Sequence, residues 1–333
     1  MSVYASVFRE PRPPTAVIGA GAAGRALALR LADHGYPVRA VLSRTAASAE
    51  ALAALVGAPV AADRLDRLPG DVRLVVLAAP DGALAGLAET LVEKRHAWAE
   101  TVVVHASGAL SADVLAPLAD VGATVLAFHP LQALPPGADG AALDGATVGL
   151  QGTPRAVAAG VELAAGLGLR YLVTEAEDRP RYHLAATMAS NFLVTLVGMV
   201  QETLASIGLD RAQAIGVIEP LLRGTLDNLS AASPEEALTG PVVRGDLETL
   251  KRHGLALRAH LPQLVPAYAA LSVETVRLAV RSGRLAPERA ERVLTLMQQM
   301  VTIPLPERGG EADREPRPPA APRPPASRPV EGV

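Results

Sequence analysis

The sequence contains no cysteine and only two lysines, Lys94 and Lys251. Without cysteine the chain forms no disulfide, no thiolate metal site and no cysteine nucleophile. A mechanism that needs a lysine as proton donor or Schiff-base former has only those two positions available. No metal-binding residues are predicted.

The chain also lacks a surplus of positive charge and long apolar segments. The chain carries 31 basic and 34 acidic residues, a formal net charge of -3, so it lacks the basic surplus of nucleic-acid-binding proteins. No stretch of about 18 residues is apolar and free of charge, and the N-terminus has no signal-peptide segment. We expect a cytoplasmic protein that binds neither nucleic acid nor membranes. Its 50% hydrophobic content suffices for a sizeable core.

The first half of the chain is predicted to be an α/β domain over residues 15–177. Short apolar segments with turn residues at their ends alternate with helical stretches. Strands are expected at residues 15–18, 38–42, 74–79, 101–104, 124–128, 147–150 and 171–173. This alternation is typical of a Rossmann-type, doubly wound parallel sheet.

After residue 178 the pattern becomes helical, which predicts an all-α domain over residues 178–303. Its first helix should run from Asp178 to Gly208, roughly 40 Å at 1.5 Å per residue, and form one long central helix. Residues 1–14 and 304–333 are rich in proline and lack an apolar period, so both are predicted to be disordered.

The strand at 15–18 is followed by the sequence GAGAAG at residues 19–24 and then by a helical stretch. A GxGxxG motif between a strand and a helix is the fingerprint of a dinucleotide site. Its glycines allow a tight turn, close approach of the backbone to a pyrophosphate, and tight packing of helix on strand. The predicted pyrophosphate-binding residues are Gly19, Ala20, Gly21, Ala22 and Gly24.

The end of the second strand predicts which dinucleotide binds. NAD-binding domains usually carry an acidic residue about 20 positions after the last glycine, but this chain has Ser43 and Arg44 there. Arg44 is suited to pair with a 2′-phosphate, and Ser43 adds a hydroxyl. We therefore predict NADP(H) as cofactor, with Ala79 and Pro80 also at its site.

Polar residues at the other strand ends and on the long helix are the catalytic candidates. Ser107 and His129 follow expected strands, where the carboxyl ends of the sheet meet. His183, Thr187 and Asn191 are spaced i, i+4 and i+8, which places them on one face of the helix. They form either a polar stripe facing a cleft or a set of internally satisfied residues at a domain or subunit contact.

A third set of candidates lies in the sequence LTGPVVRGD at residues 238–246. Thr239 and Gly240 belong to a turn, and the guanidinium of Arg244 is suited to clamp a carboxylate. We predict that these residues bind the substrate.

Four sequence strings resemble one bacterial family: FHPLQ (128–132), YHLAA (182–186), ASN (189–191) and LTGPVVRGD (238–246). That family pairs a Rossmann-like domain with a C-terminal domain of unknown function. It falls in the superfamily of 6-phosphogluconate dehydrogenase, ketopantoate reductase and pyrroline-5-carboxylate reductase. The resemblance covers about residues 15–275. It implies a homodimer formed through the helical domain and, for some members, ketopantoate reduction in pantothenate biosynthesis.

The chain departs from the dehydrogenase relatives at one position. Those enzymes carry a Lys-x-x-x-Asn pair on the long helix, with the lysine as proton donor. Asn191 matches the asparagine, but Thr187 occupies the lysine position. We predict His183 as the proton donor and His129 as the second candidate.

The predicted function is reduction of a small carbonyl compound that carries a carboxylate, with NADP(H) as cofactor and a ketopantoate-like 2-oxo acid as first candidate. Reduction of an imine such as pyrroline-5-carboxylate is one alternative. A regulator that binds NADP without catalysis is the other.

Overall fold

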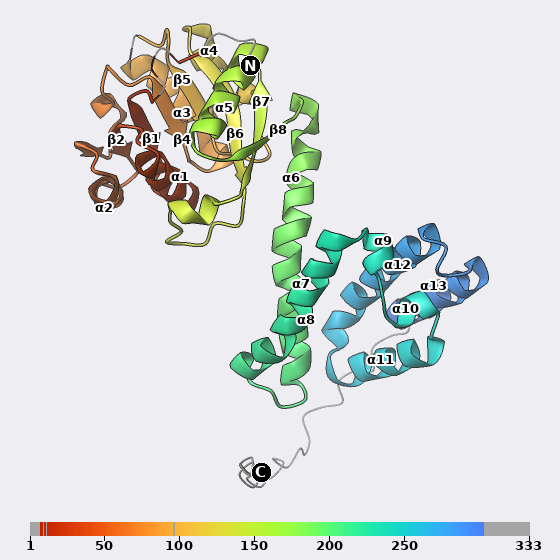
Figure 1. Cartoon of the computed structure of the whole chain (residues 1–333). Helices are drawn as coiled ribbons and strands as arrows, with labels where there is room; N and C mark the ends of the chain where they lie inside the picture. The colour runs from red at the N-terminus through yellow and green to blue at the C-terminus, as the bar shows by residue number, and fades with distance from the viewer. Residues whose placement is uncertain (1–6, 9, 11, 96, 303–333) are drawn as a thin grey trace, which may run out of the picture. The chain divides into compact units, whose positions relative to one another are not determined.

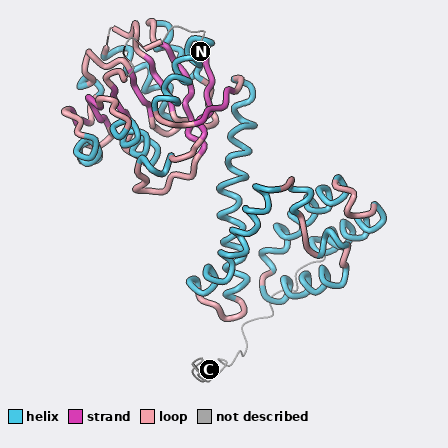
Figure 2. The backbone as a smooth tube through the Cα atoms, in the orientation of Figure 1, coloured by secondary structure: helices cyan, strands magenta, loops and turns pink. Residues whose placement is uncertain are grey.

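The computed structural model describes residues 7–8, 10, 12–95 and 97–302. The chain forms two compact units, residues 1–195 and 196–333. All the strands lie in the first unit, and the described part of the second is helical (Figure 2). The predicted disordered tail at 304–333 lies outside the described residues.

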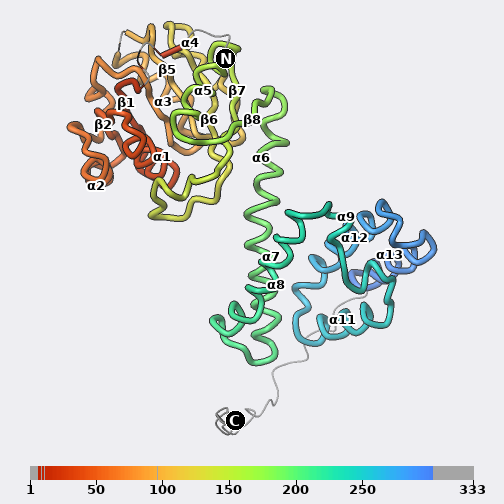
Figure 3. Tube along the Cα trace, viewed as in Figure 1, coloured from red at the N-terminus to blue at the C-terminus, as the bar shows by residue number. Residues whose placement is uncertain are grey.

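The first unit contains, within the described ranges, one sheet of eight strands in the order β3-β2-β1-β4-β5-β6-β7-β8 (Figure 1). The strands are β1 (Thr15–Ile18), β2 (Val38–Leu42), β3 (Val60–Ala62), β4 (Leu74–Leu77), β5 (Val102–His105), β6 (Thr124–Leu131), β7 (Thr147–Gly152) and β8 (Arg170–Val173). Strands β2 and β3 lie on one side of β1, and the later strands lie on the other, as the colours of Figure 3 show. The predicted doubly wound fold is confirmed, and the strand order reverses between β1 and β4.

The sheet differs from the prediction in two places. Strands β6 and β7 pair antiparallel, whereas an all-parallel sheet was expected. Only the 3-10 helix Gly140–Leu143 lies between them, and no crossover α-helix returns the chain to the starting edge. Strand β3 was not predicted because it has only three residues, two of them alanine.

Helices cover both faces of the sheet. They are α1 (Ala22–Asp33), α2 (Ala46–Val56), α3 (Asp81–Lys94), α4 (Ala116–Asp120) and α5 (Pro154–Gly166). Leu27 of α1 and Leu163 of α5 pack with Val17 in one apolar cluster. Leu84 of α3 packs with Ile18 in another. Adjacent residues of β1 thus point to opposite faces, and burial on both faces explains the continuous apolar strand sequences.

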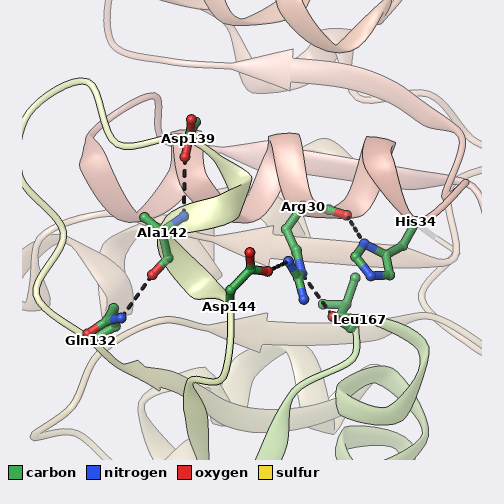
Figure 4. A network of polar contacts seen from close by, with 7 residues as sticks. All are labelled: Arg30, His34, Gln132, Asp139, Ala142, Asp144 and Leu167. Atoms are coloured by element: carbon green, nitrogen blue, oxygen red, sulfur yellow. Dashed lines mark hydrogen bonds and ion pairs between the residues drawn. The ribbon is translucent and has the colours of Figure 1, made fainter.

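A polar network ties the β6–β7 connection to helix α1 (Figure 4). The buried Arg30 of α1 forms an ion pair with Asp144 and donates from Nε to the carbonyl oxygen of Leu167 at 2.9 Å. Asp139 caps the intervening 3-10 helix by accepting from the Ala142 N–H. These contacts hold the C-terminal half of α1, whose N-terminus follows the glycine loop.

The N-terminal segment is partly packed, which corrects the predicted disorder of residues 1–14 where they are described. Phe8 is only 5% exposed and belongs to the same apolar cluster as Val17. The Val7 N–H donates to Glu162 of α5 at 3.1 Å. Burial of one aromatic ring offsets the ordering cost of this short segment.

The predicted long helix is present over Ala176–Ala205. It consists of a 3-10 turn (Ala176–Asp178), α6 (Arg179–Thr187), a π-helical turn (Met188–Phe192) and α7 (Leu193–Ala205). Within the described residues it is the one helix long and apolar enough to span a membrane, with a mean hydropathy of 1.5, whereas the sequence analysis expected no such segment. Core helices of water-soluble proteins also meet this criterion, so the helix alone is weak evidence for a membrane.

The boundary between the units falls at 195/196, inside the long helix, so α6 belongs to the first unit. The sequence had placed the boundary at 177/178, where this helix begins. The second unit contains α8 (Arg211–Ala231), α9 (Pro234–Ala237), α10 (Pro241–Arg244), α11 (Leu247–His260), α12 (Val265–Arg281) and α13 (Pro287–Thr302). Asp210 and Ser233 form the capping boxes of α8 and α9.

Candidate functional site

The glycine loop lies at the carboxyl end of β1, next to β4. Gly19 has φ 112°, a backbone region that favours glycine, and a Cβ there would collide with the carbonyl group of Ala78. A Cβ on Gly24 would collide with the carbonyl oxygen of Gly19. Around Gly21, by contrast, a Cβ would meet no described protein atom within 4 Å. Gly19 and Gly24 are therefore required by the fold, whereas Gly21 leaves open space.

The residues of this loop fit a dinucleotide pyrophosphate. Helix α1 begins at Ala22 with Gly21 as N-cap, and no side chain caps its first N–H groups. Those groups and the positive end of the helix dipole face the open space at Gly21. Ala20 and Ala22 flank that position without a bulky side chain.

The predicted 2′-phosphate site lies where β2 ends. The Ser43 N–H donates to the carbonyl oxygen of Ala62 in β3, which fixes the backbone there. Arg44 is exposed and takes part in no ion pair among the described residues. Thr45 caps α2 by accepting from the Ser48 N–H. Arg44 is thus an exposed cation at the end of β2.

Ala79 and Pro80 follow β4, the strand beside the glycine loop. Pro80 is the N-cap of α3. The Ala78 N–H donates to the carbonyl oxygen of Ile18 at 2.8 Å, which joins the ends of β4 and β1. Both predicted residues are therefore at the carboxyl edge of the sheet, together with the glycine loop.

Three histidines gather at the ends of β5 and β6 and the start of α6. His105 ends β5, His129 lies in β6, and His183 lies in α6. The ring centres of His129 and His183 are 5.9 Å apart, and the two rings meet edge to face. The structure thus brings together His129 and His183, two catalytic candidates far apart in the sequence.

His105 supports the loop that carries Ser107. Its Nε2–H donates to the carbonyl oxygen of Ser111 at 3.2 Å, and its Nδ1 accepts from the Ser107 N–H at 3.2 Å. The hydroxyl oxygen of Ser107 accepts from the Leu110 N–H at 3.1 Å. His105 is fully buried, and burial together with the positive charge of Arg179 lowers its pKa to about 4.

This buried histidine predicts loss of stability in mild acid. The unfolded chain takes up a proton at His105 below about pH 6.5, whereas the folded chain does so only near about pH 4. Above about pH 6.5 His105 is neutral in both states and does not reduce the free energy of unfolding. As the pH falls from about 6.5 to about 4, the unfolded chain binds the extra proton and the free energy of unfolding decreases. Between about pH 7 and about pH 4, His105 should lower the free energy of unfolding by about 3 kcal/mol.

Urea unfolding of the wild type and of His105→Asn at both pH values measures this contribution. Asparagine does not titrate, so the variant should lose about 3 kcal/mol less than the wild type over the same interval. An identical pH dependence in both proteins would contradict the assignment.

The hydroxyl group of Tyr182, the residue immediately before His183 in α6, forms a hydrogen bond with His129. His129 Nδ1 and Tyr182 Oη are 3.0 Å apart. The Gly149 backbone lies close to the same hydroxyl, and a Cβ at Gly149 would come within 2.5 Å of it. Burial, and next the positive charge of Arg179, lower the pKa of His129 to about 4. Burial raises the pKa of Tyr182.

Gly108 lies where two histidine rings converge. A Cβ on this buried residue would collide with Nδ1 of His183 and would come within 2.9 Å of Nε2 of His129. His183 Nδ1 is itself buried and has no hydrogen-bond partner among the described groups. One nitrogen from each ring thus approaches the same point over Gly108.

Arg179 is a fully buried cation in this cluster. Its Nη2 and Nε donate to the carbonyl oxygens of Ser107 and Leu110, the latter at 3.1 Å. Its guanidinium carbon lies 5.2 Å from the centre of the Tyr182 ring. No carboxylate among the described residues pairs with it, and its Nη1 has no partner. Burial lowers its pKa.

The other two residues of the predicted helical stripe are arranged differently. The hydroxyl of Thr187 donates to the carbonyl oxygen of His183 at 3.0 Å, within its own helix. Asn191 is exposed and lies in the π-helical turn. Because that turn interrupts the α-helix after Thr187, the α-helical spacing assumed for all three residues does not extend to Asn191.

The predicted substrate residues Thr239, Gly240 and Arg244 belong to the second unit. Gly240 precedes α10 with φ 104°, and Arg244 is the last residue of that helix. The side chains of Thr239 and Arg244 are exposed. Their role in substrate binding stays a prediction.

Sequence reasoning missed His105, Gly108, Arg179 and Tyr182. One signal was available for Arg179. It is the first residue of α6, where the helix dipole disfavours a positive charge, so its presence there requires another contact. For Gly108 and Tyr182 no local signal exists, because their partners lie on other elements.

Two family descriptions match the chain. Residues 2–130 match the Rossmann-like domain, and residues 146–275 match a domain of unknown function, DUF2520. Comparison with curated proteins gives no match.

Solved structures with the same fold cover most of the chain. A Bacteroides fragilis protein, provisionally named as an NADP oxidoreductase, is 26% identical with a TM-score of 0.65, over 80% of this chain and 98% of that one. A reductive aminase from Aspergillus terreus in complex with NADPH is 16% identical with a TM-score of 0.53, over 87% and 93%. A pyrroline-5-carboxylate reductase from Coxiella burnetii is 12% identical with a TM-score of 0.51, over 87% and 98%. These structures share the fold of this chain, and its two parts match the Rossmann-like domain and the DUF2520 domain.

Proposed function

We propose that this protein is an NADP(H)-dependent oxidoreductase that reduces a small carbonyl compound bearing a carboxylate. A ketopantoate-like 2-oxo acid is the first candidate. The observation that carries the proposal is the position of two features at one edge of the sheet. The glycine loop and open α1 N-terminus follow β1, and the cluster of Ser107, His129 and His183 stands at the ends of β5 and β6. Ligands of doubly wound sheets bind at that edge.

NADPH, when bound, would supply the hydride. The α1 N-terminus would hold its pyrophosphate, and Arg44 with Ser43 its 2′-phosphate. His183 would give a proton to the developing alkoxide of the substrate. Ser107 and Asn191 would orient that alkoxide by hydrogen bonds.

The residues proposed to bind the substrate are those that the sequence singled out. Arg244 would hold the carboxylate through its bidentate fork, and Thr187, Thr239 and Gly240 would line the substrate. The resemblance to the Bacteroides fragilis protein, at 26% identity, supports the choice of NADP(H) and of an oxidoreductase.

Incubation with NADPH and a panel of 2-oxo acids and cyclic imines tests the proposal. Turnover is followed by the absorbance of the reduced nicotinamide. Oxidation of NADPH with the 2-oxo acids is the expected result. Turnover with cyclic imines alone would identify an imine reductase, and tight NADPH binding without any turnover would identify a regulator.

The choice of NADP(H) predicts the effect of Arg44→Asp. Loss of the phosphate partner should weaken NADPH binding by about 10- to 100-fold, the value of one charge-assisted hydrogen bond. NADH binding should improve, because aspartate accepts from the ribose hydroxyls. Titration calorimetry with both dinucleotides measures the change. Arg155→Asp on α5 alters the net charge equally and should leave both affinities unchanged; equal weakening in the two variants would contradict the assignment.

We also propose a homodimer whose interface lies within residues 185–300. Large apolar side chains are exposed in this range, among them Val194 at 70%, Ile207 at 72% and Leu221 at 71%. Exposed apolar surface of this kind marks protein interfaces. Light scattering at micromolar concentration, on the chain without residues 304–333, should report a dimer. A monomer would contradict the proposal.

A further inference from the structure

Two features of the His129 environment are not used by the function proposed above: the Tyr182 hydroxyl at 3.0 Å and the buried cation Arg179. From them we infer that His129 acts as a neutral hydrogen-bond donor whose Nε2–H polarises the carbonyl oxygen or imine nitrogen of the substrate, with Tyr182 and Arg179 as positioning residues. The catalytic part of this inference rests on the proposed reductase activity. The protonation state and tautomer of the His129 ring do not depend on that activity.

The hydrogen bonds of Tyr182 determine which ring nitrogen carries the proton. The proton of the Tyr182 phenol needs an acceptor, and among the described residues no acceptor other than His129 forms a hydrogen bond to this hydroxyl. His129 Nδ1, at 3.0 Å, is that acceptor. In a neutral imidazole the other nitrogen then carries the proton. His129 therefore presents an Nε2–H group.

The charges around His129 keep the ring neutral. Arg179, which pairs with no carboxylate among the described residues, contributes its positive charge from α6, and His183 and His105 also act on the ring, from α6 and β5. Asp81, the first residue of α3, acts in the opposite sense, and Tyr182 is a neutral phenol. Burial is the largest cause and the positive charge of Arg179 the next, and together they lower the pKa of His129 to about 4. At neutral pH His129 cannot act as an imidazolium acid.

The direction of the Nε2–H group connects this state to the reaction. It faces the point over Gly108 that His183 Nδ1 also approaches. His129 Nε2 forms no hydrogen bond among the described residues and is not fully buried, so a substrate atom that reaches it would receive a hydrogen bond from it, with the His183 ring alongside. A neutral imidazole costs no proton and stabilises developing negative charge by a fixed dipole. The two histidines would thus have different tasks, polarisation for His129 and proton transfer for His183.

Nitrogen NMR of the histidine side chains tests the ring state in the free protein, without substrate or cofactor. His129→Gln identifies the signals of His129 by their loss. We expect the Nε2–H tautomer between about pH 5 and about pH 8 and a titration midpoint at about pH 4. The Nδ1–H tautomer, or a midpoint near the ordinary 6.5, would overturn the inference.

A pair of variants at position 179 separates charge from packing. Arg179→Gln removes the positive charge, so the His129 midpoint should rise from about 4 toward 6.5. Arg179→Lys keeps the charge and should leave the midpoint low. Equal midpoints in the two folded variants would contradict the electrostatic role; if either fails to fold, the wild-type tautomer and midpoint still decide.

Tyr182→Phe tests the tautomer and connects it to catalysis. The phenol proton no longer fixes Nδ1, so a mixture of both tautomers should appear. The kcat should fall by about 2- to 13-fold, the value of one neutral hydrogen bond, with KM little changed. A single Nε2–H tautomer and an unchanged kcat would contradict the role of Tyr182. If the wild type has the expected ring state but reduces no substrate, the proposed function fails and the ring assignment stands.

Discussion

Turnover of the His183→Gln variant should fall by about 10²- to 10⁴-fold, the usual contribution of a general acid. Glutamine keeps a polar side chain of similar reach but exchanges no proton near neutral pH. NADPH affinity should barely change, because the glycine loop and Arg44 are separate from α6 in the chain and lie at β1 and β2. Steady-state kinetics and a dinucleotide titration on the same preparation measure both quantities.

His129→Gln is the matched control for that experiment, since its ring faces the same point over Gly108. A glutamine amide still donates a hydrogen bond, so the loss of turnover should be smaller than at His183. A large loss only at His129 would transfer the proton-donor role there, and equal losses would refute the division of tasks. Near-normal turnover of His183→Gln with a native-like melt would show that His183 only packs.

Gly21→Val should abolish most NADPH binding while leaving the fold intact. The backbone at Gly21 has φ -72°, which valine adopts without strain, and a Cβ would meet no described protein atom within 4 Å. The side chain would instead occupy the space in front of the free α1 N–H groups. Loss of two charge-assisted hydrogen bonds to the pyrophosphate corresponds to about 10²- to 10⁴-fold in affinity.

Gly24→Ala is the comparison that separates binding from folding. Its Cβ would collide with the backbone carbonyl of Gly19, so the loop must shift. Overpacking of this kind costs about 1–3 kcal/mol, and this variant should therefore melt at lower temperature as well as bind NADPH less tightly. Calorimetric melts and titrations distinguish the two. A Gly21→Val protein that binds NADPH normally would contradict the cofactor site.

Local sequence patterns predicted the parts of the fold that depend on local physics. The apolar strands, the glycine loop between β1 and α1, and the capping boxes at Asp210 and Ser233 each require only neighbouring residues. The antiparallel pairing of β7 was not predictable in this way, because an apolar strand has the same composition in either direction. Phe8 likewise gave no local signal, since its burial depends on α1, α5 and the sheet.

The candidate site divides in the same manner. The sequence by itself determined the dinucleotide loop, the cation at Arg44 and the presence of histidines at a strand end and on the long helix, because strand ends and helical spacing follow from periodicity. Only the tertiary structure decided that His129 and His183 approach one point over Gly108, and that Tyr182 and the buried Arg179 surround them. Protonation state depends on burial and on charges from other elements, and these exist only once β5, β6 and α6 are packed together.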